Sequence, residues 1–252
     1  MSNKEYTFDY SLIPLGFYDD IAKQKKGMRS FWHYLKFQRI IDFLNTQSNV
    51  NSIIDYGCFC GTLLGMVDNS KLKEQVGLDI LEDQIDYAQK NYQTEFRNFQ
   101  LIDDYNRDFP YKKTDSITIV EVIEHLELSQ TSEVLDFATK RLNSGGFFML
   151  TTPNYLSFWP VLEVILNAVS EVNYKEQHIT KFNFFNIEEK LRSINPIFSD
   201  NFELEFVTTS HFLTPFIAPF SFKFAEYLSK FSPHNKWQFP FGNIIMICFK
   251  RK

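Results

Sequence analysis

An α/β domain built on a mostly parallel sheet is the fold that this sequence of 252 residues predicts. Short apolar segments alternate with helix-like segments over residues 49–154, and this alternation is typical of a parallel sheet with helices on both faces. Hydrophobic residues make up 44% of the chain and charged residues 23%, a balance that indicates a globular protein rather than a disordered one.

Seven segments have the composition of β-strands. The first runs directly into a glycine loop, and the fifth follows the turn formers Asn143, Gly145 and Gly146. The last two lie beyond residue 200. The seven predicted strands are Ser52–Tyr56, Gln75–Ile80, Phe96–Ile102, Asp115–Val122, Gly146–Thr152, Phe202–Thr208 and Ile244–Lys250.

Four segments are typical of helices. One begins near Arg29, and its apolar residues recur at helical spacing so that they form a single stripe. Another has acids early and a base late, which suits the helix dipole. The stripe consists of Phe31, Leu35, Ile40, Ile41 and Leu44, and the other three helices are expected at Leu81–Asn91, Gln130–Leu142 and Asn186–Ile194.

The chain divides into N-terminal cap helices at residues 1–48 and a main domain at 49–252, which carries an insertion at 211–241 between its last two strands. A hairpin needs far fewer residues. The insertion holds eight phenylalanines, and its prolines exclude a single long helix. Two interpretations stay open: a cap buried against the main domain, or an aromatic face at a membrane interface or a substrate mouth. Phe220, Phe224, Leu228 and Phe231 would form that face, beside Lys223, Lys230 and Lys236.

Charge and composition limit the partners and the location of the protein. The net charge is −5, so we expect no nucleic-acid partner, which would need a clustered basic face. No apolar stretch approaches the roughly 18 residues of a membrane span, and the polar first ten residues do not resemble a secretory signal. Cys58, Cys60 and Cys248 are too few for a disulfide framework. We expect a cytoplasmic protein of unspecified oligomeric state, with membrane association through the insertion left open.

The glycine loop after the first strand has the features of a cofactor site. Gly57 and Gly61 allow positive φ and close approach of a ligand, and the next helix offers free N–H groups. Asp55 stands at the strand end, and Asp79 ends the second strand, where a carboxylate can bind both ribose hydroxyls of a nucleoside. Glycines also occur in such turns for geometry alone, but the order of strand, loop, helix, strand and acid favours the cofactor site. The fingerprints of NAD and of phosphate-binding loops do not occur.

This pattern resembles class I S-adenosylmethionine-dependent methyltransferases, especially the ubiquinone-pathway-like and type 11 or type 23 small-molecule methyltransferases. Asp55, Gly57 and Gly61 match the outer positions of their first motif, whereas Phe59 stands where the middle glycine is usual. The segments around Glu121–Leu126 and Leu142–Gly146 also match the family. The resemblance implies a Rossmann-like seven-stranded sheet with the last strand antiparallel, an aromatic-rich helical cap, and S-adenosyl-L-methionine as the cofactor.

The resemblance also assigns residues to the site. It implies that Tyr18 and Arg29 of the N-terminal cap cover the methionine end of the cofactor. Glu124 and His125 are the candidate catalytic residues, and we assign no metal ligand. The candidate cofactor-binding residues are Asp55, Gly57, Cys58, Gly61, Asp79, Ile80, Asp103, Asp104 and Glu121.

Three interpretations of the acid–histidine segment after the fourth strand stay open. In the first, Glu124 or His125 is a general base or orients the substrate. In the second, these two residues bind a divalent metal together with Glu121 and His178, which would acidify a substrate hydroxyl. In the third, Glu121 contacts the cofactor while Glu124 and His125 only cap the next helix.

The sequence therefore predicts a methyltransferase that acts on an oxygen of an apolar or amphipathic small molecule, such as a quinone precursor, a lipid or a glycolipid. One alternative is a metal-dependent RNA 3′-end 2′-O-methyltransferase. A second alternative is a cofactor-binding protein without catalytic activity, for which Phe59 is the sequence observation.

Overall fold

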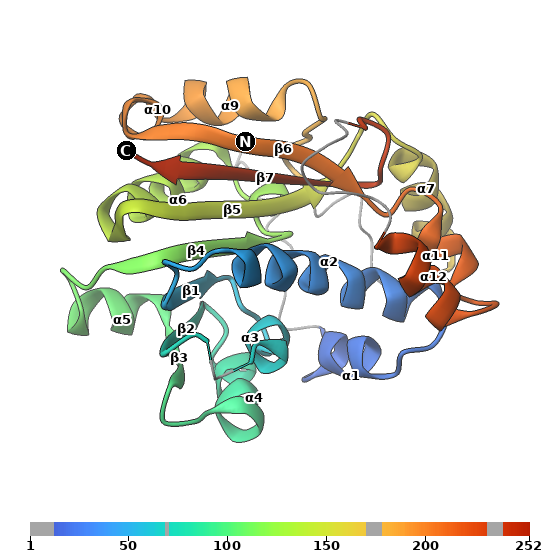
Figure 1. The fold of residues 1–252 in the computed structure, drawn as a ribbon, viewed down its shortest axis with the longest axis horizontal. Helices are drawn as coiled ribbons and strands as arrows, with labels where there is room; N and C mark the ends of the chain where they lie inside the picture. The colour runs from blue at the N-terminus through green and yellow to red at the C-terminus, as the bar shows by residue number, and fades with distance from the viewer. Residues whose placement is uncertain (1–12, 69–70, 170–177, 231–238) are drawn as a thin grey trace, which may run out of the picture.

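The computed structural model describes residues 13–68, 71–169, 178–230 and 239–252. Seven strands form one sheet in the order β3-β2-β1-β4-β5-β7-β6 (Figure 1). β7 pairs antiparallel with β5 and β6, and the other neighbouring strands pair in parallel, so the predicted fold class is confirmed. The strands are β1 (Ser52–Tyr56), β2 (Glu74–Asp79), β3 (Arg97–Leu101), β4 (Thr114–Val120), β5 (Leu142–Pro153), β6 (Phe202–Ser210) and β7 (Ile244–Arg251).

The strand β5 differs most from its prediction. It begins at Leu142, four residues before the expected start at Gly146, because Leu142 already pairs with Thr114 of β4. The register then shifts between Thr114 and Ser116, and Gly145 takes a φ of 77°. The turn-forming residues are thus an irregular part of the strand rather than a loop before it.

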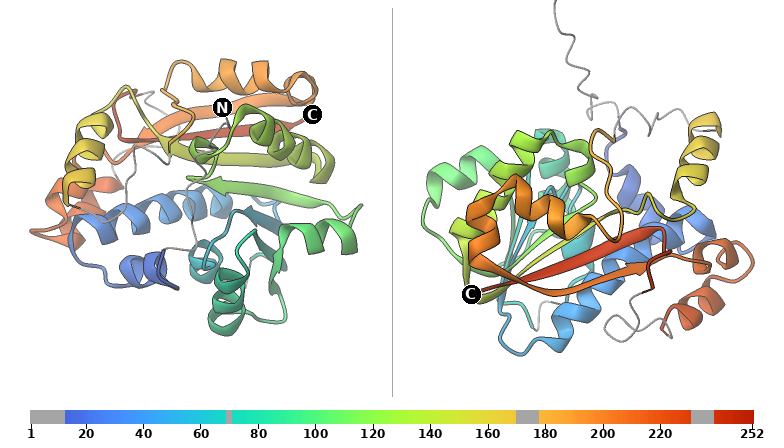
Figure 2. Two further views of the ribbon diagram at one scale, coloured as in Figure 1. Left: turned by 180° about the vertical axis from the view of Figure 1, so that it is seen from behind. Right: turned by 90° about the horizontal axis from the view of Figure 1, so that it is seen from above.

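Helices cover both faces of the sheet (Figure 2). On one face, α2 (Gly27–Thr46), α3 (Thr62–Met66) and α4 (Glu82–Tyr92) pack through apolar side chains such as Ile40, Leu64 and Ile85. The other face is covered by α5 (Ile102–Asp108), α6 (Leu128–Arg141), α9 (Ile187–Ile194) and α10 (Pro196–Asn201). The two apolar cores that result hold the carboxyl ends of the strands in fixed positions.

The helix α2 confirms the predicted N-terminal stripe. Phe31, Leu35, Ile40, Ile41 and Leu44 are all buried. Ile40, Ile41 and Leu44 join the same core as β1, so this part of α2 packs directly on the sheet. Phe31 and Leu35 pack instead against Ala218 and Ala225 of the insertion. The helices α4, α6 and α9, and every predicted strand except β5, agree with the structure to within two residues at each end.

A cap lies beyond the carboxyl ends of the strands, at one end of the molecule (Figure 1). It consists of α1 (Phe17–Lys23), α7 (Trp159–Val169), α11 (Thr214–Ile217) and α12 (Phe222–Ser229), and each of these helices contacts α2. The insertion thus forms two short helices, as its prolines predict; Phe231 and Lys236 lie outside the described residues. Among the helices that are described, none has the length and apolar character needed to cross a bilayer.

Candidate active site

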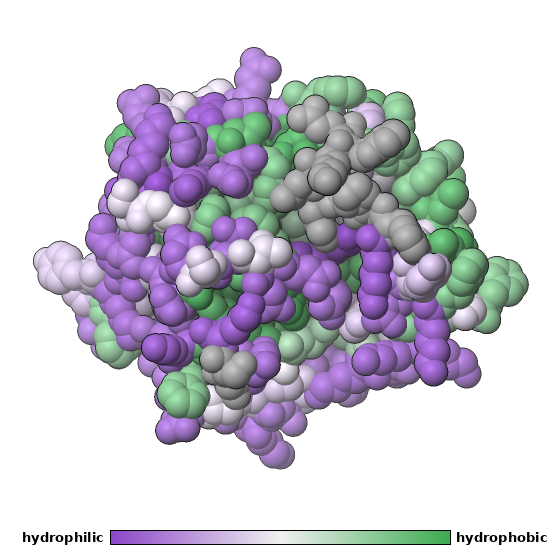
Figure 3. All heavy atoms as spheres, viewed as in Figure 1, coloured by the Kyte–Doolittle hydropathy of each residue, from purple (hydrophilic) through white to green (hydrophobic). Residues whose placement is uncertain are grey.

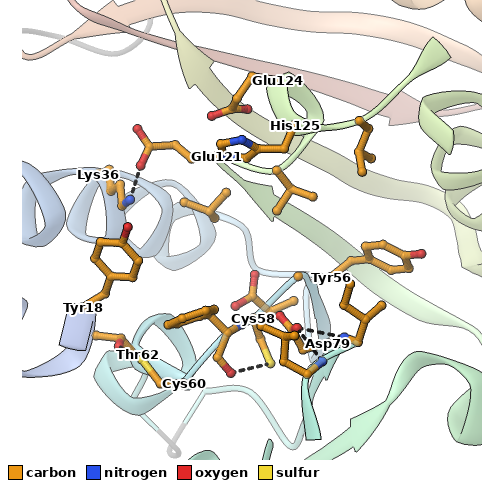
Figure 4. A pocket seen from close by; sticks show the side chains of 18 of the residues that line it. Tyr18, Lys36, Tyr56, Cys58, Cys60, Thr62, Asp79, Glu121, Glu124 and His125 are labelled. Carbon is orange, nitrogen blue, oxygen red and sulfur yellow. Dashed lines mark hydrogen bonds and ion pairs between the residues drawn. The ribbon is translucent and has the colours of Figure 1, made fainter. Parts of the chain in front are cut away.

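A cavity of about 740 Å³ lies at the carboxyl edge of the sheet, between the ends of β1 and β4. These two strands are neighbours at the point where the strand order reverses, which is where open α/β sheets bind ligands. The volume is in the range of sites for small molecules. In Figure 4 the glycine loop and Asp79 form one wall, and Glu121, Glu124 and His125 form the opposite wall.

The two glycines of the loop meet requirements that no other residue would meet. Gly57 has a φ of 76°, and a Cβ atom there would lie 2.6 Å from Val122 Cγ2. Gly61 has a φ of 77°, and its Cβ would lie 2.6 Å from Phe99 Cε1. The N–H groups of Gly57 and Cys58 both donate to the Leu78 carbonyl, which fixes the loop to the end of β2. The loop is thus closely packed on the protein side, with its other side facing the cavity.

Phe59 has a left-handed backbone conformation, which glycine adopts more readily than other residues. Its φ is 48°, a left-handed value that costs a non-glycine residue about 1–2 kcal/mol. Its N–H donates to Asp79 Oδ2 at 2.7 Å, and its ring meets Tyr18 edge-on with 5.4 Å between centroids. Phe59 therefore connects the loop to the end of β2 through its backbone and to α1 through its ring.

Asp79 is buried at the end of β2 and is held by three backbone N–H groups. Besides Phe59, Ile80 and Leu81 donate to its Oδ1 at 2.8 and 3.1 Å. Burial raises the pKa of Asp79, although these N–H groups oppose the rise. The neighbouring Ile80 lines the cavity with 72% of its surface exposed. A carboxylate fixed in this way is oriented to accept hydrogen bonds from a ligand.

The remaining residues predicted for the cofactor divide into two groups. Asp55 is buried and accepts a hydrogen bond from the Thr118 hydroxyl at 2.8 Å, and burial raises its pKa to about 7. Asp55, Cys58 and Asp103 line the cavity. Asp104 does not line it: this side chain forms an ion pair with Arg107 at 2.9 Å on the outer side of α5.

Glu121 is bound to a lysine that the sequence analysis did not single out. Lys36 of α2 forms an ion pair with Glu121, and the two side chains point toward one another in Figure 4. Burial would raise the pKa of Glu121, but the charges of Lys36 and His33 and the hydrogen bond from Lys36 together outweigh it and lower the pKa to about 2. Glu121 also has a φ of 54°, so this residue is held in a rare backbone conformation with its carboxylate ionised.

Glu124 lies in a short 3-10 helix, Ile123–His125, and is the most unusual group in the cavity wall. Its side chain is 1% exposed, and neither carboxylate oxygen has a hydrogen-bond partner, although Thr152 lies nearby. Burial, and secondly the charge of Glu121, raise its pKa to about 8.

Glu124 and His125 do not cap α6, because Glu127 and Gln130 form the capping box there. The capping part of the third interpretation is therefore wrong.

The structure brings His178 next to these residues. The rings of His125 and His178 have centroids 5.0 Å apart, and one ligand atom from each of Glu124, His125 and His178 lies within 4.8 Å of the other two. His178 Nδ1 lies 2.8 Å from Glu163 Oε1 and 2.9 Å from the Tyr155 hydroxyl. Burial lowers the pKa of His178, so its ring is neutral near pH 7. This neutral histidine, held by a carboxylate, has the chemistry of a metal ligand or of a proton acceptor.

His33 and Lys36 line the cavity but were not assigned a role from the sequence, although one signal pointed to them. With Arg29, which was assigned to the cofactor, they recur at i, i+4 and i+7 and form a polar face on α2, whose other face is buried in the core. All three line the cavity, with Tyr18 close to His33 at 4.9 Å between ring centroids. Trp159 of α7 lines it as well, and no local pattern predicts that contact.

Comparison with known families identifies one match. The model of a methyltransferase-domain family, Methyltransf_23, matches residues 28–195. That range contains the glycine loop, Asp79 and the acid–histidine segment. No curated protein matches the sequence.

Solved structures share the fold at low sequence identity. A SAM-dependent methyltransferase from Archaeoglobus fulgidus is 18% identical with a TM-score of 0.55, and the match covers 86% of this chain and 93% of that one. The plantazolicin methyltransferase BpumL, solved with SAH, is 17% identical with a TM-score of 0.62, covering 93% and 88%. The magnesium protoporphyrin IX methyltransferase from Synechocystis PCC 6803, also with SAH, is 14% identical with a TM-score of 0.58, covering 93% and 94%.

Proposed function

The chain belongs to this family of methyltransferase domains, and on that basis we propose that it transfers a methyl group from S-adenosylmethionine to an oxygen of an apolar or amphipathic small molecule. Four structural neighbours were solved with SAH or SAM, which supports the same cofactor here. The observation that supports transfer to an oxygen is the carboxylate of Glu124, which is buried in the cavity wall without a hydrogen-bond partner.

The residues of the glycine loop fit the cofactor. Asp79 is fixed by three N–H groups at the end of β2, so its remaining lone pairs suit the two hydroxyls of a ribose. Asp103 lies in the first turn of the helix after β3, on the same cavity wall as Ile80. Arg29 and Tyr18 line the cavity from the cap side, and the guanidinium of Arg29 suits the carboxylate of the methionine end.

The chemistry needs a desolvated acceptor and a base. S-adenosylmethionine supplies the methyl group on a positively charged sulfur, and the sulfur keeps the electron pair of the broken bond. Glu124 takes the proton of the acceptor hydroxyl as the oxygen forms its new bond to carbon, because a base with a pKa of about 8 is well matched to this transfer near neutral pH. His125 lines the same wall and orients the acceptor beside Glu124.

The walls near Glu124 support an apolar or amphipathic acceptor. Trp159, Leu162 and Ile179 line this side of the cavity, and Trp32 packs against Trp159 with 5.3 Å between ring centroids. Such walls exclude water and favour the carbon skeleton of a substrate. A polynucleotide would need a basic surface, which the net charge of −5 does not support.

A divalent cation at Glu124, His125 and His178 is the second candidate, and the mutual distances of their ligand atoms favour it. Glu163 would orient His178, as carboxylates do for metal-bound histidines. Glu121, the fourth ligand expected from the sequence, is instead paired with Lys36. A cation held by the three residues would acidify a bound hydroxyl and take over the role given to Glu124.

A transfer assay distinguishes these proposals. Purified protein with S-adenosylmethionine labelled in its methyl group is incubated separately with a cellular lipid extract, a panel of phenols and a short RNA. We expect label in the lipid or phenol fraction and none in RNA. Label in RNA alone would contradict the substrate class. The assay is repeated after EDTA treatment and with added Mn²⁺: loss and recovery of activity would assign the cation rather than Glu124 alone.

A further inference from the structure

One end of the molecule exposes a group of large apolar side chains from the insertion. We call this group the aromatic end: Leu213, Phe216, Phe220, Phe224 and Tyr227. Phe220 is 91% exposed. Figure 3 shows apolar side chains gathered at this end of the molecule, where α11 and α12 lie. Scattered apolar residues are normal on a protein surface, but a cluster of this kind marks an interaction site.

The side chains of the aromatic end are not needed to hold α12 in place. That helix is anchored through its other face, where Ala225 and Ser229 are buried and Phe222 packs on Phe31 with 5.1 Å between ring centroids. Phe224 and Tyr227 are spaced i, i+3 and share the outward face. The fold therefore separates the buried, anchoring face of α12 from an exposed, aromatic face.

The helix α7 lies at the same end of the molecule (Figure 2), and exposed apolar side chains occur on it and directly before it. Phe158, Val161 and Val164 are exposed, whereas Trp159 and Leu162 face the cavity. Phe158 also contacts Phe212 of the insertion, with 6.4 Å between ring centroids. The exposed apolar surfaces of α7 and of the insertion are thus connected. The opposite side of α7 forms part of the cavity wall.

Lysines surround the aromatic end, although the chain as a whole is acidic. Lys223 and Lys230 are exposed on α12. Lys25 lies over the ring of Tyr34 at 5.3 Å, and the Tyr34 hydroxyl donates to Glu226 of α12 at 2.7 Å, so Lys25 also belongs to this end. Lys26 is exposed next to it. Glu226 is the one acid within the described part of the insertion.

We propose that the aromatic end docks on a lipid bilayer that contains anionic lipids. Phenylalanine and tyrosine side chains enter the boundary between headgroups and acyl chains, and lysines reach the phosphates with their flexible stems. The lysines at the aromatic end complement the negative charge of anionic lipids. The chain as a whole has a net charge of −5 and would be repelled by such a surface, so this end is the part of the chain that suits it. The proposal is independent of the reaction that the cavity catalyses.

Vesicle flotation tests this inference with the full chain. The protein is mixed with vesicles of phosphatidylcholine alone or with 30% phosphatidylglycerol, a composition chosen for the test, and the bound fraction is measured. We expect binding to the anionic vesicles that weakens in high salt. Phe220→Ser with Phe224→Ser should lower the partition coefficient by about tenfold or more, since each side chain contributes apolar area. Lys223→Glu with Lys230→Glu should lower it for anionic vesicles only.

Control variants at the amino edge of the sheet, away from the aromatic end, show whether the effect on vesicle binding is specific to that end. Tyr111 is 92% exposed and Lys113 is exposed, so Tyr111→Ser and Lys113→Glu make the same chemical changes away from the aromatic end. Both should bind vesicles like the original protein, and thermal unfolding checks that every variant is folded. Absence of vesicle binding, or equal losses in the matched variants, would overturn the proposal. A dimer that becomes monomeric in Phe220→Ser, without vesicle binding, would assign the aromatic end to a second copy instead.

Discussion

Lys36 and Glu121 form an ion pair in the wall of the cavity, joining α2 to the residue that follows β4. Lys36 is buried, and Glu121 is nearly so. The pair therefore links the N-terminal helix to the strand end that leads into Glu124 and His125, and it sets the charge on one side of the site.

Replacing Lys36 with methionine should destabilise the protein by about 3 kcal/mol at pH 7, because a buried carboxylate would lose its partner. The pKa of Glu121 is lowered from its usual 4.5 to about 2. A lowered pKa stabilises the fold above pH 4.5, and this contribution is lost as the pH falls toward 2. Urea unfolding across this range should show that loss in the original protein and a smaller one in the variant.

The double variant Lys36→Met with Glu121→Gln is the control for this prediction. It removes both charges, so it should recover part of the lost stability. A double variant as unstable as the sum of both single variants would show that the two residues do not interact.

Replacing Asp79 with asparagine should weaken the binding of S-adenosylhomocysteine by about tenfold or more, since charged acceptors form the stronger hydrogen bonds to hydroxyls. Titration calorimetry measures the affinity. Asp104→Asn makes the same change outside the cavity and should bind normally. Unchanged affinity in Asp79→Asn would contradict the assignment of the ribose site.

Replacing Glu124 with glutamine should slow methyl transfer by about 10²–10⁴-fold, the range for losing a general base. In the original protein the rate should rise with pH up to about 8 and then level off, because Glu124 must be ionised to accept a proton. The variant should lack this rise. Glu95→Gln at the surface serves as the matched variant, and an unchanged pH profile in Glu124→Gln would assign the base elsewhere.

Glu124→Gln should slow methyl transfer, but it should also make the folded protein more stable. A carboxyl group whose pKa is raised by folding stabilises the fold below pH 4.5, and the contribution is lost as the pH rises toward 8. Glu124→Gln should therefore become more stable than the original protein over this interval. Unfolding by urea at pH 5 and pH 8 checks the difference, which should be larger at pH 8.

Replacing Gly57 with alanine should destabilise the protein more than the same change at Gly145. Both residues have a positive φ, which costs alanine about 1–2 kcal/mol. At Gly57 the new methyl also meets Val122, adding about 1–3 kcal/mol of strain, whereas nothing lies within 4 Å at Gly145. Thermal unfolding compares the two variants, and equal losses would show that the packing of the loop is less tight than described.

The sheet could be predicted from the sequence because each strand carries its own local pattern. Ser52–Tyr56 matches β1 at both ends, since a short segment rich in β-forming residues ends at a glycine. The site could be predicted only where function follows directly from a strand end, as at Asp79. Lys36 was missed because its role depends on α2 lying beside the end of β4, which no local pattern records. Asp104 was included because Asp103 and Asp104 are neighbours, and a helix turns neighbouring side chains in different directions.

The pairing of β7 between β5 and β6 has a consequence for the evolution of this chain. The insertion leaves the sheet at the end of β6 and returns at the start of β7, and both points lie at the same edge. Residues can therefore be gained or lost there without changing the register of any strand. The segment that carries the aromatic end is therefore free to diverge among descendants, while the strands and the cofactor loop beside the cavity stay as they are.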